Sequence, residues 1–428
     1  MKPSRYRWFV IGTFFVFVLL HQCDKLLIGP LTTPIMETFG IDEAQMGMVF
    51  SGAVIVGAIC YPLWGYLYDR FARARLLALA AFIWGATTWL SAVVRTFPAF
   101  VVTRASTGID DSSYPGLYNL IADYFEPKVR SRVNGLLQVA MPLGYLIGMV
   151  LAMVLGGIVG WRAVFLITGS LGIVLSVVIF FGVREPKRGG SEPELQGVEQ
   201  IREYRFDWHI ARGLLKNRTW LLVVGNGFFG QFPWQVIQFW FFRYLERERG
   251  YSSGEVLITM VLAVLVLAAG YPLGGLLGDL FFRRSMRGRL LVSAAGAITG
   301  AILLVVTLNL PAGEKVLFGL LMCLTALFMP FAAPNVTSTI FDITLPEVRS
   351  TAYAVENFVE LLGSSAAPML AGLIAVRSSL GTAILYICTS MWLVCTVFLV
   401  LAAYAAPRDM LTLRKELQHR AELARAGA

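Results

Sequence analysis

Apolar runs long enough to cross a lipid bilayer follow one another along most of this chain, and they restrict its fold more than any other feature. A helix of about 20 apolar residues spans the hydrocarbon core of a membrane. The runs are continuously apolar instead of alternating in polarity, which predicts helices and not a barrel of strands. We therefore expect an all-α membrane protein with about twelve transmembrane helices. The runs lie at residues 8–34, 43–68, 75–95, 98–124, 131–157, 161–183, 218–245, 252–280, 288–309, 314–342, 348–376 and 380–405.

The composition supports this interpretation and excludes a water-soluble protein. Hydrophobic residues make up 57% of the 428 residues and charged residues only 15%, far from the average of soluble domains. The net charge of +9 comes largely from Lys and Arg in short loops, so it indicates membrane topology and not nucleic-acid binding. Basic clusters follow the second, fourth and eighth runs, at residues 70–75, 128–132 and 283–289. Because basic loops stay on the cytoplasmic side, we expect both termini in the cytoplasm and the protein in the inner (plasma) membrane.

Two sequence phrases occur twice and divide the chain into similar halves. The stretch 61–75, YPLWGYLYDRFARAR, is echoed at 271–279 by the same Tyr-Pro-Leu, a glycine and an aspartate, again followed by arginines. A second phrase that begins at Asp123 is echoed by one that begins at Asp342. Internal duplication of this kind is typical of many transporters. The predicted units are an N-terminal six-helix bundle (1–183), a cytoplasmic linker with an interfacial helix (184–217), a C-terminal six-helix bundle (218–406) and a cytoplasmic tail (407–428).

The repeated phrase resembles the signature of a large transporter family. The spacing Gly65-x-x-x-Asp69-Arg70-x-x-Arg73-x-Arg75, with its weaker echo that ends at Asp279, is similar to a motif of the major facilitator superfamily. The resemblance covers nearly the whole chain. It implies two pseudo-symmetric six-helix bundles around a central cavity and a cytoplasmic gate formed by the motif. The gate residues implied in this way are Gly65, Asp69, Arg70, Arg73 and Asp279.

A finer resemblance concerns the first and fourth apolar runs, which line the central cavity in that superfamily. Asp24-Lys25 stands where spinster-type lipid transporters and the anion:cation symporters carry Asp-Arg. The stretch Arg104-x-x-x-Gly-x-x-Asp111-Ser-Ser-Tyr114 resembles the Arg-x-x-x-Gly-x-x-Glu-Ala stretch of their fourth helix. These matches imply an organic anion, or a lipid with an anionic head group, as the substrate.

Ionisable residues inside apolar runs are costly in a membrane, so each is a candidate functional residue. Arg104 and Asp111 are seven residues apart, which places them on one face of a continuous helix. Asp24 and Lys25 reach a similar depth from the first run. We interpret Asp111 and Asp24 as the proton carriers, with a static salt-bridge cluster as the alternative. The predicted substrate-binding residues are Lys25, Arg104, Tyr114, Gln231, Trp234, Gln235, Gln238, Glu356 and Glu360.

Two further ionisable residues lie beside these candidates. His21 comes one helical turn before Asp24 and can share its proton, although packing between helices is the simpler interpretation. Asp110 points about 100° away from Asp111 on a helix, towards a water pocket or a neighbouring helix. In the second half, the glutamines of the seventh run share one helix face, which indicates either a substrate-binding wall or amide contacts between helices.

Together these features predict a secondary active transporter that works by alternating access and is coupled to protons. Its predicted substrate is an organic anion or an amphiphile with an anionic head group such as a lysolipid. A proton symporter of a small carboxylate such as a sugar acid is the alternative, and a non-transporting membrane sensor is a third hypothesis. The sequence has no Walker loop and no GxSxG or HExxH motif, so we expect no enzyme activity, cofactor or metal. The expected partners are the small-molecule or lipid substrate, protons and membrane lipids, without nucleic acid, and we expect a monomer.

Overall fold

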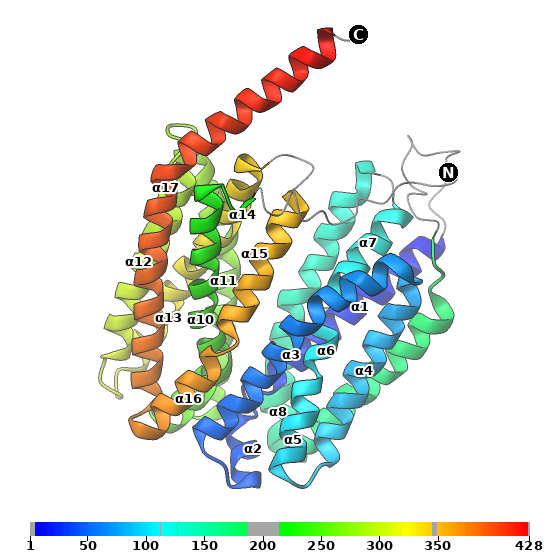
Figure 1. The fold of residues 1–428 in the computed structure, drawn as a ribbon. Coiled ribbons are helices and arrows are strands. Elements are labelled where there is room, and N and C mark those ends of the chain that lie inside the picture. The colour runs from blue at the N-terminus through cyan, green and yellow to red at the C-terminus, as the bar shows by residue number, and fades with distance from the viewer. Residues whose placement is uncertain (1–4, 112, 126, 187–213, 345–348, 427–428) are drawn as a thin grey trace.

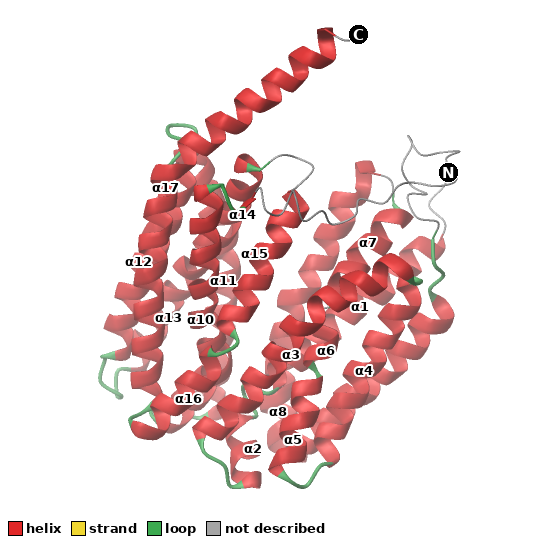
Figure 2. Ribbon diagram, viewed as in Figure 1, coloured by secondary structure: helices red, strands yellow, loops and turns green. Residues whose placement is uncertain are grey.

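The fold comes from a computed structural model that describes residues 5–111, 113–125, 127–186, 214–344 and 349–426. All regular secondary structure in these residues is helical (Figure 2). Nine helical segments among them are long and apolar enough to cross a membrane. The prediction of an all-α membrane protein is therefore confirmed. The interfacial helix predicted in the linker falls mostly on residues outside the described part.

The first half of the chain forms one helical bundle. Gly160 interrupts its longest helix with a φ of 79°, a conformation that glycine adopts at low steric cost. This break separates the fifth predicted span from the sixth, as the sequence indicates. The helices are α1 (Arg5–Leu27), α2 (Thr32–Phe39), α3 (Glu43–Arg70), α4 (Arg73–Val93), α5 (Phe97–Ser106), α6 (Gly108–Asp111), α7 (Tyr114–Tyr124) and α8 (Pro127–Gly182).

The second half forms the other bundle. Its tenth and eleventh predicted spans are each divided into shorter helices, at positions that carry proline: Pro330 lies in the first turn of η2, and Pro368 in that of α16. Proline lacks a backbone donor and is tolerated best in the first turn of a helix. The elements are α10 (Arg218–Arg247), α11 (Ser253–Phe282), α12 (Gly288–Leu308), α13 (Lys315–Phe328), η2 (Met329–Phe331), α14 (Ala332–Ile343), α15 (Arg349–Ser364), α16 (Ala367–Arg377) and α17 (Leu380–Ala426).

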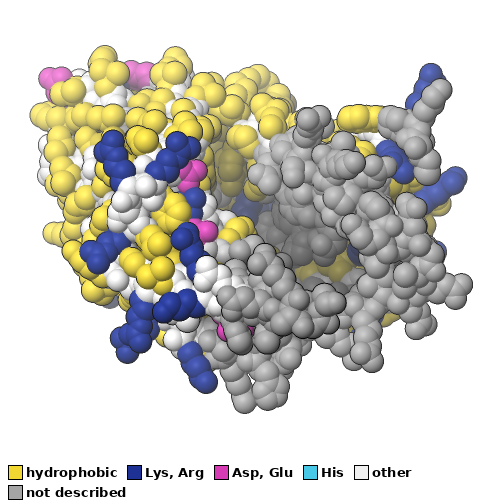
Figure 3. Space-filling view, turned by 90° about the horizontal axis from the view of Figure 1, so that it is seen from above, with side chains coloured by type: hydrophobic (Ala, Val, Ile, Leu, Met, Phe, Trp, Pro, Cys, Tyr) yellow, Lys and Arg dark blue, Asp and Glu magenta, His cyan; other side chains and the backbone are white. Residues whose placement is uncertain are grey.

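The two bundles lie side by side and meet at the end of the molecule opposite the chain termini (Figure 1). We call this the closed end, and the opposite one the terminal end. Figure 3 looks onto the terminal end and shows a recessed surface between the bundles. Lys and Arg side chains gather there over the second bundle, and the exposed Arg283, Arg284 and Arg287 belong to the basic loop that follows α11. This position agrees with the basic loop predicted after the eighth run.

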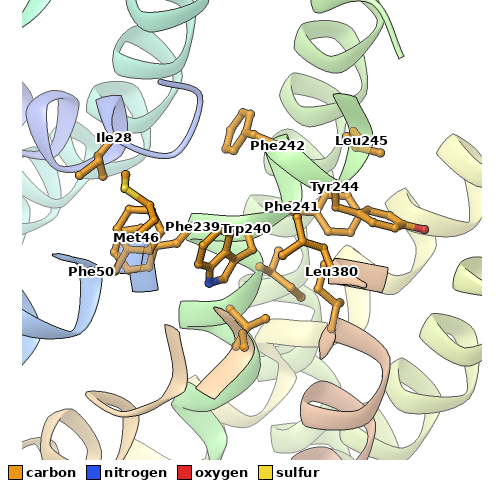
Figure 4. Close-up of a cluster of buried hydrophobic side chains, with 14 of the residues drawn as sticks. Ile28, Met46, Phe50, Phe239, Trp240, Phe241, Phe242, Tyr244, Leu245 and Leu380 are labelled. Atoms are coloured by element: carbon orange, nitrogen blue, oxygen red, sulfur yellow. The ribbon is translucent and has the colours of Figure 1, made fainter. Parts of the chain in front are cut away.

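A shared apolar core joins the bundles at the closed end (Figure 4). Phe50 of α3 stacks on Phe239 of α10 with 4.4 Å between ring centroids, and it meets the edge of Trp240 at 5.3 Å. The backbones also approach closely, because a Cβ atom on Gly47 of α3 would lie 2.8 Å from the Cα of Met369 in α16. Each bundle has a separate apolar cluster of its own. The two bundles can therefore move as units if the shared core breaks.

Polar contacts between the bundles surround this core. Arg243 of α10 donates two hydrogen bonds to the Glu43 carboxylate, the shorter at 2.7 Å, and one of 3.2 Å to the Thr33 hydroxyl. Thr33 in turn donates to Glu246 at 3.0 Å, and Arg247 forms an ion pair with Glu37. The sequence indicates acidic and mixed charge in these loops but does not predict these pairings. They connect α2 and α3 to α10, so opening the closed end must break them.

Candidate functional site

Asp24 is a buried carboxylate held from several helices. Its side chain comes from α1, and the residue is 3% exposed. Thr88 of α4 donates a hydrogen bond of 2.9 Å to Oδ2, and Thr168 of α8 donates one of 2.8 Å to Oδ1. Nη1 of Arg104 in α5 lies 3.9 Å from Oδ2. A buried carboxylate is costly unless it is paired and hydrogen-bonded, and these contacts supply both kinds of partner.

Arg104 supplies a buried positive charge next to Asp24. Its residue is 5% exposed, and its guanidinium lies 5.1 Å from the ring centroid of Phe165. A guanidinium over an aromatic face gains electrostatic attraction, and its planar fork suits a carboxylate or phosphate. Lys25, which is half-buried, adds a second cation from α1. The prediction that Asp24, Lys25 and Arg104 share one site agrees with this geometry.

His21 and Asp110 form a second buried pair beside the first. His21 Nε2 lies 2.6 Å from Asp110 Oδ2, a hydrogen bond between α1 and α6. The imidazole stacks on Phe17 with 5.9 Å between centroids and meets the edge of Trp84 at 5.5 Å. Sequence reasoning noted each of the two residues but did not pair them. The signal was present, since both residues are ionisable and lie within apolar runs.

These charged side chains line one small cavity of about 40 Å³. This volume holds a few water molecules and not a complete organic anion. The cavity also has apolar walls, and Phe239 of α10 contributes the second bundle's part of its lining. The charged and titratable side chains that line it are His21, Asp24, Lys25, Arg104 and Asp110.

The fourth predicted span differs from the continuous helix on which the sequence argument relied. It is divided into α5, α6 and α7, with breaks next to Gly108 and Pro115. A Cβ atom on Gly108 would lie 2.0 Å from the carbonyl oxygen of Ala53, so only glycine permits this close approach to α3. The two-turn argument that put Arg104 and Asp111 on one face assumed a continuous helix, and it stays a prediction because the side chain of Asp111 lies outside the described part of the structure. It is Asp110 whose side chain the described structure places in the cavity wall.

Three predicted residues have side chains outside the described part of the structure: Asp111, Tyr114 and Asp69. Their roles in proton transfer, substrate binding and gating stay predictions.

A second polar cluster lies in the other bundle. Gln231 of α10 donates a hydrogen bond of 3.0 Å to Glu360 of α15. Glu356, one turn earlier on α15, is 4% exposed and packs against Gly227. Gln231 is therefore paired with a side chain on a neighbouring helix, one of the two interpretations that the sequence left open.

The remaining predicted residues of α10 are buried or half-buried. Gln235 and Gln238 are each 8% exposed, and Trp234 is half-buried. Within the described part of the chain, Gln235 Oε1 and Gln238 Nε2 have no hydrogen-bond partner. Since a buried unpaired amide costs free energy, these two atoms are suited to a polar ligand or to water.

The predicted gate motif forms ion-pair clusters at the terminal end of both bundles. In the first, Arg73 contacts Asp123 at 2.7 Å and Glu185 at 2.8 Å. In the second, Arg289 contacts Asp279 at 2.7 Å and also pairs with Asp342. Asp123 and Asp342 are equivalent positions of the repeated phrases, and in each bundle this aspartate pairs with an arginine in the first turn of the helix that follows the motif.

Two other residues of the motif, Gly65 and Arg70, lie on α3. Arg70 is exposed and lies over the ring of Tyr66, 4.3 Å from its centroid, and Gly65 lies within α3. Glu185 was not among the residues predicted from the sequence. Besides its contact with Arg73, it accepts a hydrogen bond of 2.8 Å from the backbone of Ala74. It comes directly after the last apolar run of the first bundle, where composition alone indicates a linker.

Comparisons with known proteins agree with this architecture. The family model described as Major Facilitator Superfamily matches residues 13–368. The chain is 27% identical over 392 residues to protein spinster of Drosophila melanogaster, covering 87% of this chain and 62% of that protein. It is 25% identical over 378 residues to the sphingosine-1-phosphate transporter SPNS2 of Danio rerio, covering 83% of this chain and 74% of that protein.

A bacterial relative and a solved structure extend the comparison. The probable galactarate/D-glucarate transporter GudP of Bacillus subtilis (strain 168) is 26% identical over 311 residues, which are 66% of this chain and 67% of that protein. The crystal structure of a bacterial homolog to the human lysosomal transporter Spinster, in an inward-facing and unoccupied conformation, superposes with a TM-score of 0.77. That match covers 97% of this chain and 98% of the other at 20% identity, so it supports the fold alone.

Proposed function

Because the chain belongs to the major facilitator superfamily of membrane transporters, we propose that it works by alternating access and carries an organic anion together with protons. The observation that carries the proposal is the buried cluster of Asp24, Lys25 and Arg104 in one cavity wall. Ionisable groups inside a membrane are expensive, and those that persist commonly bind substrate or protons. Fixed cations attract the anion, and carboxylates accept protons.

The preferred substrate is an amphiphile with an anionic head group, such as a lysolipid. Lys25 and Arg104 supply the charge for a phosphate or carboxylate head, and Arg104 can form two parallel hydrogen bonds with it. Ile28, Val49 and Phe50 give the same cavity apolar walls, which would suit a hydrocarbon chain once the closed end opens and the cavity widens beyond its present volume of about 40 Å³. Similarity to a protein named as a sphingosine-1-phosphate transporter supports this class.

A small carboxylate such as a sugar acid is the second candidate. The buried amides of Gln235 and Gln238 suit the hydroxyl groups of such a molecule, because each hydroxyl both donates and accepts hydrogen bonds. Similarity to a probable galactarate/D-glucarate transporter supports this class. Glu356, Glu360, Gln231, Trp234 and Tyr114 complete the proposed substrate contacts for either class.

Protons are proposed to enter through carboxylates of the first bundle. Asp111 is the first proposed carrier and Asp24 the second. Asp24 contacts Arg104, so protonating it would release a positive charge that an anion can then pair with. Exchange of a proton for a salt bridge in this way would connect proton binding to substrate binding.

The terminal end is the proposed cytoplasmic side. Basic side chains of the loops lie there, and basic loops favour the cytoplasm. The motif residues Gly65, Asp69, Arg70, Arg73 and Asp279 are the proposed cytoplasmic gate when the cavity faces outward. Residence in the plasma membrane, a monomeric state and the division into units 1–183, 184–217, 218–406 and 407–428 belong to the same proposal.

The test of the proposed function is uptake by purified protein in liposomes. A panel of sphingosine-1-phosphate, lysophosphatidylcholine, lysophosphatidylglycerol, D-glucarate and D-xylose is presented with and without an inward proton gradient. We expect at least one anionic compound to accumulate with the gradient and the neutral sugar to be excluded. Uptake of D-xylose alone, or uptake that ignores the gradient, would contradict the proposal.

A substitution on α10 should separate the two substrate classes. Gln235→Leu removes a buried amide from the proposed wall for hydroxyl groups, and a lost hydrogen bond costs about 1–2 kcal/mol, or roughly 5–30-fold in affinity. We expect D-glucarate uptake to fall by that factor while uptake of a lysolipid changes less than about twofold. Gln235→Asn, which keeps an amide, is the matched control. An equal loss for both compounds would show that Gln235 does not discriminate between them.

A further inference from the structure

A hydrogen-bonded histidine and aspartate in the cavity wall have no part in the mechanism proposed above. His21 and Asp110 are 3% and 1% exposed, with 2.6 Å between Nε2 and Oδ2. They come from α1 and α6, which are far apart in sequence, so their contact exists only in the folded bundle. We propose that His21 and Asp110 form a second proton-binding pair, which takes up a proton when an anionic substrate binds beside it. This inference rests on the proposed function for the identity of the anion.

The geometry of the pair suits reversible protonation of the imidazole. Neutral histidine can donate its Nε2 proton to the Asp110 carboxylate, and a second proton turns the same contact into an ion pair. Hydrogen bonds between charged groups are stronger than those between neutral groups. Phe17 stacks on the imidazole and Trp84 packs nearly perpendicular to it, so its neighbours fix the position of the ring. Histidine titrates near neutral pH, where small changes in surroundings alter its charge.

The charges around the pair connect it to anion binding. The ionised groups that line the cavity are Asp24 and Lys25 from α1, Arg104 from α5 and Asp110 from α6. Residues that line it from α3, α4 and α10 are uncharged: Val49, Phe50, Ala53, Val54, Trp84 and Phe239. The charges of these lining groups sum to zero when His21 is neutral.

A proton on His21 therefore makes the cavity more positive by one charge. An anionic head group between Lys25 and Arg104 offsets that charge, so each ligand favours the other. Linkage makes the effect reciprocal: the factor by which the anion raises proton affinity equals the factor by which the proton raises anion affinity.

Nuclear magnetic resonance of ¹⁵N-histidine-labelled full-length protein in nanodiscs tests the pair directly. The chain has 3 histidines, so few signals appear, and His21→Gln identifies the one that belongs to His21. We expect this signal to titrate between about pH 5 and 9. Asp110→Asn removes the negative partner and should lower the proton affinity of His21 at least tenfold. Glu314→Gln, at an exposed position near the closed end, is the matched control and should leave the titration unchanged.

Two results would overturn the inference. One is a His21 signal that keeps a single protonation state over that pH range. The other is an equal titration midpoint in the native protein and in Asp110→Asn. Because Asp110→Asn is read on an intact His21, the conclusion does not depend on the folding of His21→Gln.

Adding an anion separates this inference from the proposed function. Sphingosine-1-phosphate and D-glucarate are the probes, and the one that binds should raise the proton affinity of His21 at least tenfold. A probe that is transported but leaves the titration of His21 unchanged contradicts the coupling of the pair. If His21 titrates and depends on Asp110 but neither probe binds or is transported, the proton pair stands and the proposed substrate classes fail.

Discussion

Replacing Arg104 with glutamine is expected to lower transport of the anionic substrate at least a hundredfold. The substitution removes the buried cation next to Asp24 and leaves that carboxylate with one fewer stabilising partner. Removing one member of a buried ion pair costs about 3–5 kcal/mol, and the loss of two hydrogen bonds to the substrate adds to it. The measurement is initial uptake in proteoliposomes at matched protein content.

Two further variants decide whether charge or geometry matters. Arg104→Lys keeps the charge but not the planar fork, so we expect an intermediate loss of about tenfold in affinity. Arg377→Gln, at an exposed position at the end of α16, is the control for removing an arginine and should transport normally. Native uptake by Arg104→Gln would mean that Arg104 only packs against Phe165 and binds no substrate.

Replacing Arg243 with alanine is expected to shift the protein towards a state that opens at the closed end. Arg243 makes hydrogen bonds to Glu43 and Thr33 across the interface between the bundles. A loss of about 1–2 kcal/mol moves a two-state equilibrium roughly 5–30-fold. Spin labels at Thr96 and Gly313, which are exposed in closed-end loops of different bundles, report the opening as longer distances in pulsed electron resonance.

The background for this measurement replaces the five cysteines, all of which are free thiols. Arg218→Ala, at the first residue of α10 and so at its other end, serves as the control and should keep the native distance distribution. An unchanged distribution in Arg243→Ala would show that the shared apolar core alone holds the closed end together.

The course of the helices follows from the sequence because crossing a membrane requires continuous apolar length. The boundary between the fifth and sixth predicted spans was also predictable. The fifth span ends at 157 and the sixth begins at 161, and Gly160, with its positive φ, lies between them. The breaks around α6 were not predictable in this way. They depend on the contact of Gly108 with the backbone of Ala53, which no property of the fourth run by itself reveals.

The sequence identifies the charged residues of the candidate site, because burying them costs free energy, but it does not identify the side chains that they contact. Charged residues such as Asp24 and Arg104 are conspicuous in apolar runs, because burying them requires compensation. The hydroxyl groups that compensate Asp24 come from Thr88 and Thr168. Threonines in helices commonly bond to their own backbone, so nothing in the sequence distinguishes these two. Helix geometry predicts that Asp110 and Asp111 point in different directions, but it does not predict that Asp110 pairs with His21. That pairing depends on the orientation of α6.

The ion-pair clusters at the terminal end were predictable only in part. The repeated phrases identified equivalent residues such as Asp123 and Asp342, but a repeat in sequence does not say which side chains touch. The structure joins each of them to an arginine at the start of the third membrane span of its bundle, Arg73 of α4 or Arg289 of α12. Their pairing required the three-dimensional positions of three elements in each bundle.

Proton-driven uptake and substrate counterflow, recorded in the same proteoliposomes, test the central claim most directly. The native protein should accumulate an anionic compound of the panel when an inward proton gradient is imposed, and it should also exchange that compound without a gradient. Asp111→Asn fixes the neutral form of the proposed carrier, so it should lose gradient-driven accumulation and keep counterflow within about tenfold of native. Full gradient-driven accumulation by Asp111→Asn would contradict its role as the carrier, and native uptake that ignores the gradient would contradict proton coupling itself.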